Sequence, residues 1–504
     1  MKPVDIDGRS LTLDDFDAVV SRTALAGLTQ EAKQQISLGR TTVDAALDKG
    51  ETIYGVTTGF GDLATVRIEH ENIETLQRRL ILSHCAGVGE PLPDAVVRGM
   101  LLLRANTLSR GHSGVRLQLV ESLLGLLEFD VLPVVPSRGS VGASGDLAPL
   151  AHLALPLLGH GSVRHNGKVL DAKAGLEMAG LNPLSLQAKE GLALINGTQA
   201  MTSLLCVAVG RCQHLVRVAD LVGAMATDAL RGTDTPFDAR LHLLRPHPGK
   251  IASAGNLWRL LQGSAIRESH RHNDVRIQDP YSVRCIPQVH GAVRDVLDDV
   301  RQKVAIEINS VTDNPLVFPD DGEILSGGNF HGEPMALAAD VLAMAVSELA
   351  AISERRIEKL TNTAFSALPP FLVHDAGLNS GFMIAQVTAA ALVSENKTLA
   401  HPASIDSIPT SADKEDHVSM GMWAALKLQS ILDNAEQVLA IELLCAAQGL
   451  DLLRPLRSSE MLERVHVALR EVVPVWEVDR EMSPEISAAH QFISDAGLFL
   501  DGLA

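Results

Sequence analysis

Aromatic residues are scarce in this chain: they make up 3% of its 504 residues, and only two of them are tyrosines. A core with so few rings must be packed mainly from aliphatic side chains, and the abundant Ala and Leu are strong helix formers. Hydrophobic residues account for 46% and charged residues for 21%, which is typical of a globular protein and excludes a disordered one. The composition therefore predicts a mainly α fold.

An excess of basic residues is also missing. The net charge is −18 and the isoelectric point is about 5.4. An acidic surface repels the phosphates of nucleic acids and anionic lipid head groups, so we expect neither nucleic acid nor a membrane as a partner. Every long apolar run is interrupted by charges, Gly or Pro, and the first residues do not resemble a signal peptide, so a cytoplasmic location is expected.

Cysteine pairs with the spacing of a metal or redox motif are absent. The five cysteines are Cys85, Cys206, Cys212, Cys285 and Cys445. Because no two of them form a CxxC pair, the pattern predicts reduced core residues and no bound metal.

The chain changes character near residue 200. Residues 1–200 mix short apolar groups with loops rich in Gly and Pro, which predicts an N-terminal portion of mixed α and β structure. Residues 201–504 contain long apolar segments at 334–362, 383–397 and 422–453, which predict buried helices. Such helices predict a long central bundle, extended by other subunits.

A small hairpin is expected within residues 160–172. Asn166-Gly167 lies between two short apolar stretches, and this dipeptide favours the tight turns that join antiparallel strands.

The tripeptide Ala143-Ser144-Gly145 can form an electrophile. If the backbone nitrogen of Gly145 attacks the carbonyl carbon of Ala143, a five-membered ring closes, and glycine leaves room for that approach. Loss of the Ser144 hydroxyl as water then leaves a 4-methylideneimidazol-5-one (MIO) group. No standard side chain is electrophilic, so an enzyme that needs an electron sink must make or bind one. Taken alone, however, Ala-Ser-Gly is an ordinary loop sequence.

Six sequence motifs, spread over nearly the whole chain, favour an electrophile-forming tripeptide over an ordinary loop. They are residues 54–61, 142–152, 196–199, 278–285, 326–331 and 415–420. In this order they resemble the motifs of the aromatic amino-acid ammonia-lyases and aminomutases. The resemblance implies a fumarase/aspartase-like helical superfold, and a homotetramer whose active sites are shared between subunits. It also implies MIO formed from the tripeptide, without a diffusible cofactor.

The matched motifs also imply catalytic roles. Tyr54 would remove the β-proton of the substrate, since a tyrosinate is a strong enough base, although a loop tyrosine can simply cap the core. Tyr281 would hydrogen-bond near the electrophile. Asp146 follows the tripeptide, where it would either assist cyclisation or cap a helix that starts near Leu147.

A second set of residues is expected to bind substrate. Arg284 would pair with the substrate carboxylate, unless it forms a structural salt bridge. Asn196 and Gln278 would hydrogen-bond the electrophile or the polar end of the substrate, with a loop cap as the alternative for Asn196. Phe330 would form a wall of the pocket, a role that is compatible with a place in the core.

Two positions bear on which amino acid is bound. His84, preceded by Ser83, resembles the family members that act on histidine, and so does Glu415. An imidazole has donor and acceptor nitrogens with which these side chains can form hydrogen bonds. A phenyl ring would leave the polar groups of His84 and Glu415 without partners, at a cost of about 1–3 kcal/mol for each group. We therefore expect elimination of ammonia from L-histidine to give trans-urocanate. A base role or a structural ion pair for Glu415 stays open.

Other functions remain as alternatives. An aminomutase, or a lyase for tyrosine or phenylalanine, could use the same scaffold. A fumarase/aspartase-type enzyme would leave the Ala-Ser-Gly loop unexplained, and a helical scaffold protein would have no use for Tyr54, Ser144 and Arg284. Asp413-Lys414 and Cys85 depart from the histidine type beside its specificity residues.

Overall fold

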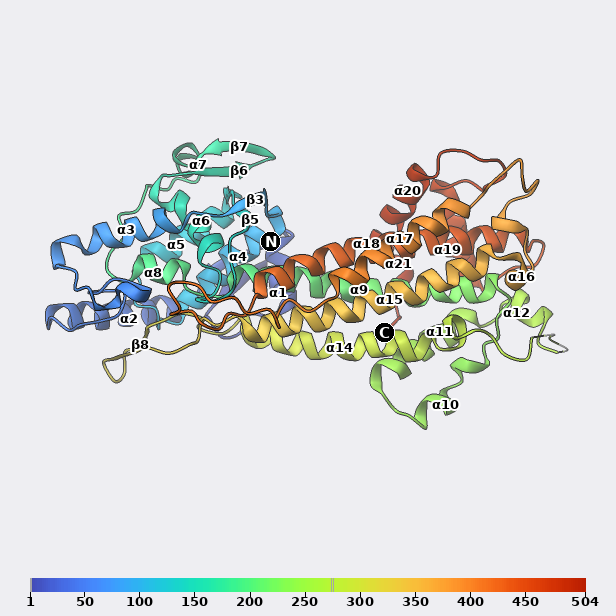
Figure 1. Ribbon diagram of the computed structural model, residues 1–504, viewed down its shortest axis with the longest axis horizontal. Helices are drawn as coiled ribbons and strands as arrows, with labels where there is room; N and C mark the ends of the chain where they lie inside the picture. Colours follow the sequence, from blue (N-terminus) through green and yellow to red (C-terminus); the bar gives the residue numbers. More distant parts are fainter. Residues whose placement is uncertain (1, 273, 275) are drawn as a thin grey trace. The chain divides into compact units, whose positions relative to one another are not determined.

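The computed structural model describes residues 2–272, 274 and 276–504, and these residues form two compact units (Figure 1). Unit 1 comprises Met1–Ala208, Arg301–Asp340 and Pro402–Leu426, and unit 2 comprises Val209–Val300, Val341–His401 and Lys427–Ala504. The first change of unit lies near the expected boundary at residue 200. The two later returns of the chain into unit 1 were not predicted, and they bring segments of the second half of the sequence to the N-terminal portion.

Unit 1 has the mixed structure expected of residues 1–200. Its strands form small pairs, namely β1 with β2 in parallel, and β3 with β5, β4 with β6, β6 with β7 and β8 with β9 antiparallel. Its elements are β1 (Lys2–Ile6), α1 (Leu13–Val20), β2 (Ala24–Leu28), α2 (Gln30–Asp48), η1 (Gly61–Thr65), η2 (His70–Asn72), α3 (Ile73–His84), β3 (Val88–Pro91), α4 (Asp94–Ser109), α5 (Leu117–Glu128), β4 (Leu132–Pro133), β5 (Pro136–Arg138), α6 (Leu147–Ala154), η3 (Leu155–Leu158), β6 (Ser162–His165), β7 (Lys168–Asp171), α7 (Ala172–Met178), α8 (Glu190–Ile195), β8 (Leu316–Phe318) and β9 (Glu323–Leu325).

The predicted hairpin is confirmed by β6 and β7, which pair antiparallel from Ser162 opposite Asp171 to His165 opposite Lys168. Asn166 and Gly167 join the strands with φ of +50° and +74°. Positive φ at both central residues is what a type I′ turn requires, which explains the Asn-Gly sequence.

Four long helices have residues in both units. They are α9 (Gln199–Ala229), α14 (Ile286–Glu307), α15 (Glu333–Thr361) and α18 (Gly421–Leu452). Helices α15, α18 and α17 (Met383–Leu399) confirm the three predicted apolar helices, and the fold is mainly α. Helix α15 is long and apolar enough to cross a membrane, but 61% of its most apolar stretch is buried inside the protein, as in a core helix.

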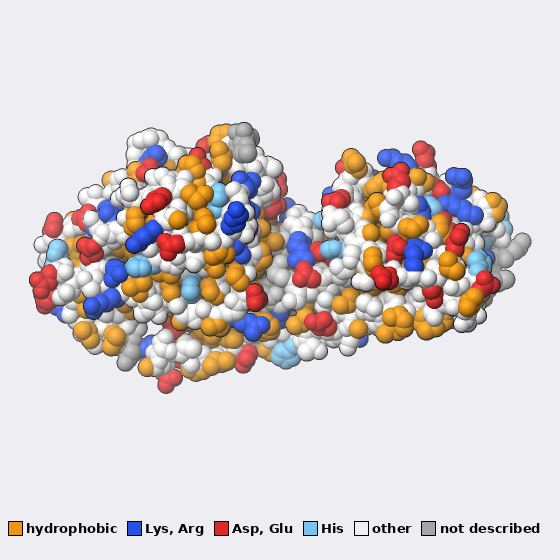
Figure 2. Space-filling model, turned by 90° about the horizontal axis from the view of Figure 1, so that it is seen from above, with side chains coloured by type: hydrophobic (Ala, Val, Ile, Leu, Met, Phe, Trp, Pro, Cys, Tyr) orange, Lys and Arg blue, Asp and Glu red, His pale blue; other side chains and the backbone are white. Residues whose placement is uncertain are grey.

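Unit 2 is otherwise built from shorter helices. They are η4 (Thr235–Phe237), α10 (Ala239–Leu243), α11 (Pro248–Leu261), α12 (Ala265–Ser269), α13 (Tyr281–Arg284), α16 (Thr363–Ser366), η5 (Pro370–Leu372), α19 (Glu460–Val472), α20 (Ser483–Ser494) and α21 (Gly497–Leu500). On the face drawn in Figure 2, acidic and basic side chains are interspersed despite the negative net charge.

Candidate active site

A cavity of about 800 Å³ in unit 1 gathers residues from five of the six matched motifs. It is bounded by the loop after residue 53, by α3 and α8, and by the segments around residues 327 and 411. Six predicted site residues line it, namely Tyr54, His84, Ser144, Asn196, Phe330 and Glu415.

Position 145 of the Ala-Ser-Gly loop has room only for glycine. Gly145 has φ of +73°, and a Cβ built on it would lie 2.1 Å from the carbonyl oxygen of Gly197. Any larger residue is therefore excluded by a backbone contact as well as by its conformation. Ala143 is buried, while Ser144 reaches the cavity. These residues fit the MIO group that the sequence predicts.

The loop is anchored by the segment that precedes α18. Ser419 Oγ donates to the carbonyl oxygen of Gly142 at 3.1 Å, and the backbone N–H of Met420 donates to the carbonyl oxygen of Val141 at 2.8 Å. Residues far apart in the sequence thus hold the tripeptide in place.

Asp146 does not cap the helix that follows it. Although α6 starts at Leu147, the Asp146 side chain makes no bond to that helix. Its Oδ2 instead accepts from the backbone N–H of Met201 at 2.8 Å, in the first turn of α9, and its Oδ1 accepts from Ser140 Oγ at 3.0 Å. The predicted cap is therefore wrong, because the carboxylate binds a first-turn N–H of a different helix, which has no partner within that helix.

The buried Asp146 also supplies a pH-dependent prediction. Burial raises the pKa of its carboxyl group from 3.8 to about 6. A raised folded-state pKa means that the folded protein binds the proton more tightly, so this contribution to stability is complete below about pH 4 and is lost as the pH rises through about 6. We expect wild type to lose free energy of unfolding relative to Asp146→Asn over this range, as measured by denaturant unfolding at a series of pH values. A difference that does not vary with pH would contradict this assignment.

Glu415 lies directly against the serine of the tripeptide. Its Oε1 accepts a hydrogen bond from Ser144 Oγ at 2.9 Å. Its Oε2 accepts from Thr410 Oγ1 at 2.6 Å and from Ser411 Oγ at 2.8 Å. Within the described part of the chain no ion pair involves Glu415, so the structural ion pair considered above has no support here.

His84 ends α3 and lines the same cavity. Its Nδ1 lies 2.9 Å from the carbonyl oxygen of Leu80, to which it can only donate. Burial lowers the pKa of His84, while the Leu80 carbonyl and the charge of Glu415 oppose that shift. A neutral ring with Nδ1–H fixed in this way keeps Nε2 as an acceptor.

Tyr54 and Asn196 each offer polar atoms to the cavity. The Tyr54 hydroxyl accepts from the backbone N–H of Gly61 at 3.0 Å, a bond that strengthens if the oxygen carries negative charge. Asn196 donates from Nδ2 to the carbonyl oxygen of Asn314 at 2.9 Å. Its Oδ1 is buried without a partner. An unpaired buried acceptor is costly, so this atom suits a polar group of a ligand.

Five predicted site residues do not line this cavity: Ala143 and Gly145, which flank Ser144, and Gln278, Tyr281 and Arg284. Gln278, Tyr281 and Arg284 belong to unit 2, where Gln278 and Arg284 line a separate cavity of about 540 Å³. Tyr281 is 70% exposed, and the guanidinium carbon of Arg284 lies 4.6 Å from the centroid of its ring. Among the described residues Arg284 has no ion-pair partner, so the salt bridge proposed as its alternative role is not observed.

Sequence reasoning missed Arg104, which lies beneath the site. This fully buried side chain of α4 donates from Nη1 to the carbonyl oxygen of Asn196 at 3.0 Å and to Gln199 Oε1 at 2.7 Å. Burial lowers the pKa of Arg104 to about 10. The sequence does indicate a buried arginine, because Arg104 directly follows the apolar run Met100–Leu103. A buried charge in such a run needs a specific partner.

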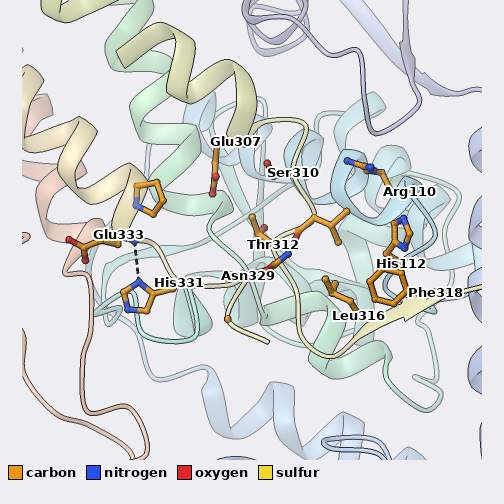
Figure 3. A pocket seen from close by; sticks show the side chains of 13 residues that line it. Arg110, His112, Glu307, Ser310, Thr312, Leu316, Phe318, Asn329, His331 and Glu333 are labelled. Atoms are coloured by element: carbon orange, nitrogen blue, oxygen red, sulfur yellow. Dashed lines mark hydrogen bonds between the residues drawn. The ribbon is translucent and has the colours of Figure 1, made fainter. Parts of the chain in front are cut away.

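A second cavity of about 640 Å³ shares a segment with the first. Gly327 and Phe330 line the first cavity, whereas Gly328 and Asn329 line the second. Figure 3 shows Arg110, His112 and Phe318 grouped on one side of it and His331 with Glu333 on the other. None of the predicted site residues lines this second cavity.

The long helices and the cavity with Ser144 and Glu415 define a helical lyase. Residues 11–471 match the family model described as aromatic amino acid lyase, and the chain belongs to this family of carbon–nitrogen lyases.

Individual relatives cover nearly the whole chain. The histidine ammonia-lyase of Anaeromyxobacter sp. (strain K) is 53% identical over 508 residues, which are 99% of this chain and 100% of the relative. The solved structure of histidine ammonia-lyase from Trypanosoma cruzi has a TM-score of 0.92 at 45% identity. The match covers 100% of this chain and 96% of the solved chain. Tyrosine aminomutase from Streptomyces globisporus has a TM-score of 0.94 at 38% identity, with coverages of 99% and 98%. The family resemblance and the mainly α fold expected from the sequence are confirmed.

Proposed function

We propose that this enzyme removes ammonia from L-histidine to give trans-urocanate, as a step of histidine degradation. The observation that carries the proposal is the placement of His84 and Glu415 in one cavity with Ser144. Two acceptors, His84 Nε2 and the Glu415 carboxylate, suit the two N–H donors of a protonated histidine ring. The histidine ammonia-lyases that resemble the chain at about half identity support the same substrate.

The electrophile of the proposed reaction is MIO, formed from Ala143-Ser144-Gly145. It would supply an electron sink that no side chain can provide. Support comes from Gly145, which lies in the left-handed region and against Gly197, and from the family to which the chain belongs.

Side chains of the cavity would handle the substrate and its protons. Tyr54 would take the β-proton, with the Gly61 N–H holding the charge that its oxygen acquires. The unpaired Oδ1 of Asn196 would accept from the substrate amine. The tripeptide ring has no N–H, so a bond to that ring would be donated by Asn196 Nδ2. Phe330 would form a wall of the pocket. Glu415 and His84 would hold the ring of the substrate.

We further propose a homotetramer in which another subunit completes each active site. Gln278, Tyr281 and Arg284 would then bind the substrate carboxylate and approach the electrophile from a neighbouring copy. Exposure of this segment supports the idea, because Ile277 is 97% and Tyr281 is 70% exposed. A cytoplasmic location is proposed from the cysteines, which are all unpaired.

A second candidate, an aminomutase, is favoured by the similarity to tyrosine aminomutase. An absorbance assay with L-histidine, L-tyrosine and L-phenylalanine separates the two, because only free elimination releases a conjugated acrylate in stoichiometric amount with ammonia. A rise with L-histidine alone supports the proposal. A rise with only L-tyrosine or L-phenylalanine would overturn the use of His84 and Glu415. A β-amino acid as the main product would favour the aminomutase.

Substrate preference should depend on His84. We expect His84→Leu to lower kcat/KM for L-histidine about 10- to 100-fold, because the ring loses a hydrogen-bond partner worth about 1–3 kcal/mol. The same change should raise the relative rate with L-phenylalanine, since an apolar residue no longer leaves a polar atom unpaired. Steady-state kinetics with both substrates check this, and an equal loss for both would contradict it.

A further inference from the structure

Two hydroxyl groups that have no role in the proposed reaction bind the carboxylate of Glu415. Thr410 Oγ1 and Ser411 Oγ both donate to Oε2, at 2.6 Å and 2.8 Å. The other oxygen, Oε1, accepts only from Ser144 Oγ among the bonds recorded for the described residues, at 2.9 Å. The two oxygens of one carboxylate therefore face different surroundings.

The backbone between these residues makes the arrangement possible. Thr410 and Glu415 pair across a tight turn, where the N–H of Thr410 donates to the carbonyl oxygen of Glu415 at 3.0 Å and the reverse bond measures 3.4 Å. The residues inside the turn, Ser411, Ala412 and Asp413, have φ of +52°, +53° and +63°. Because the chain reverses so sharply, the hydroxyls of Thr410 and Ser411 meet the carboxylate of Glu415.

Three consecutive left-handed residues without a glycine are expensive. Each costs about 1–2 kcal/mol relative to the right-handed conformation, and such strain persists only where the surrounding contacts determine it. The turn is closed by the bonds from Thr410 and Ser411 to Glu415, by the backbone pairing of Thr410 and Glu415, and by the N–H of Lys414, which donates to the carbonyl oxygen of Ser411 at 3.2 Å. Strain of this kind is found at sites where a side chain must be held in one orientation.

We propose that Thr410 and Ser411 are positioning residues for Glu415. By occupying Oε2 they fix the rotation of the carboxylate, so that Oε1 is directed at Ser144 and at the substrate ring bound beside it. Neither hydroxyl touches the reacting atoms, and both act through Glu415. The inference rests on the proposed function, since it assigns an orientation to the group that would bind the imidazole.

The kinetic test is the double variant Thr410→Val/Ser411→Ala. Hydrogen bonds to a charged group are worth about 1.5–3 kcal/mol, so we expect kcat/KM for L-histidine to fall about 10- to 100-fold, mainly through a higher KM. Thr410→Ser keeps a hydroxyl and should stay within about threefold of wild type by the same reasoning. Ser407→Ala is the matched control, because it removes a hydroxyl of the same segment that accepts from the N–H of Val418 and does not contact Glu415.

A double-mutant cycle separates positioning from general structural support. In a Glu415→Gln background, removing the two hydroxyls should change kcat/KM by no more than about threefold, since the carboxylate that they position is gone. An undiminished loss in that background would overturn the proposal, and so would a loss confined to kcat. Activity of the double variant within threefold of wild type would overturn it as well.

Two further measurements keep the outcome unambiguous. Thermal unfolding and the intact mass of each variant show whether the protein folds and cyclises. If the double variant does not fold, Ser411→Ala alone provides the test, because Ser411 is exposed, and a loss of about tenfold is expected. Wild type that shows no activity on L-histidine would instead refute the proposed function, which is a separate result.

Discussion

Replacing Ser144 with alanine is expected to abolish activity and to leave the chain without the wild-type mass deficit of two waters. Ring closure and dehydration remove two water molecules from the wild-type polypeptide, and the second of them contains the Ser144 hydroxyl. Without that hydroxyl no methylidene group can form, so the electron sink is lost. We expect kcat to fall by at least about 10⁴-fold, which corresponds to about 5.5 kcal/mol of transition-state stabilisation.

Intact-mass spectrometry and the absorbance assay measure these two effects on one sample. The cyclised wild type has already lost the Ser144 hydroxyl, and before cyclisation that hydroxyl makes a single recorded bond, to Glu415. The thermal unfolding midpoint of the variant should therefore stay close to that of wild type. A Ser144→Ala variant that still lacked two waters would refute the assignment of the tripeptide. A variant of full mass and full activity would refute the need for an electrophile.

Replacing Tyr54 with phenylalanine is expected to lower kcat about 10³-fold, while the mass stays two waters below the calculated value. General base catalysis typically contributes about 10²- to 10⁴-fold, and Tyr54 is the residue proposed for that role. The Tyr54 hydroxyl accepts one bond, from the N–H of Gly61, so the change should cost only about 1 kcal/mol of stability.

The two variants together separate formation of the electrophile from its use. Ser144→Ala should lose both the mass deficit and the activity, whereas Tyr54→Phe should lose only the activity. A Tyr54→Phe enzyme with wild-type kcat would show that another group removes the β-proton. In that case the base role considered for Glu415 would become the better assignment.

Much of the local structure could be predicted from short-range patterns. The Asn166-Gly167 turn formed as expected, because both residues tolerate positive φ. The apolar segments became the helices α15, α17 and α18. The predicted burial is not observed for α17, in which Ile384 is 63% and Val387 51% exposed in the single chain. The five cysteines are all free thiols, and three of them are buried.

Predictions that depended on distant neighbours were less successful. The cap that Asp146 was expected to form on the next helix is absent, because its carboxylate binds the first turn of α9, while its alternative role in cyclisation stays a prediction. Arg104 was overlooked, since its partners Asn196 and Gln199 lie on other elements. The hydroxyls of Thr410 and Ser411 were also overlooked, because the left-handed turn that aims them at Glu415 contains no glycine to reveal it.

The sequence by itself determined which chemical groups this protein possesses and which apolar segments form helices. Residue type and local periodicity suffice for both, as Ala143-Ser144-Gly145 and the apolar helices demonstrate. Only the tertiary structure decided that Glu415 meets Ser144, and that Tyr54 and His84 line one cavity with them. The physical reason is that the carboxylate, ring and hydroxyl groups lie on segments far apart in the chain, and only the packing of the core brings those segments together.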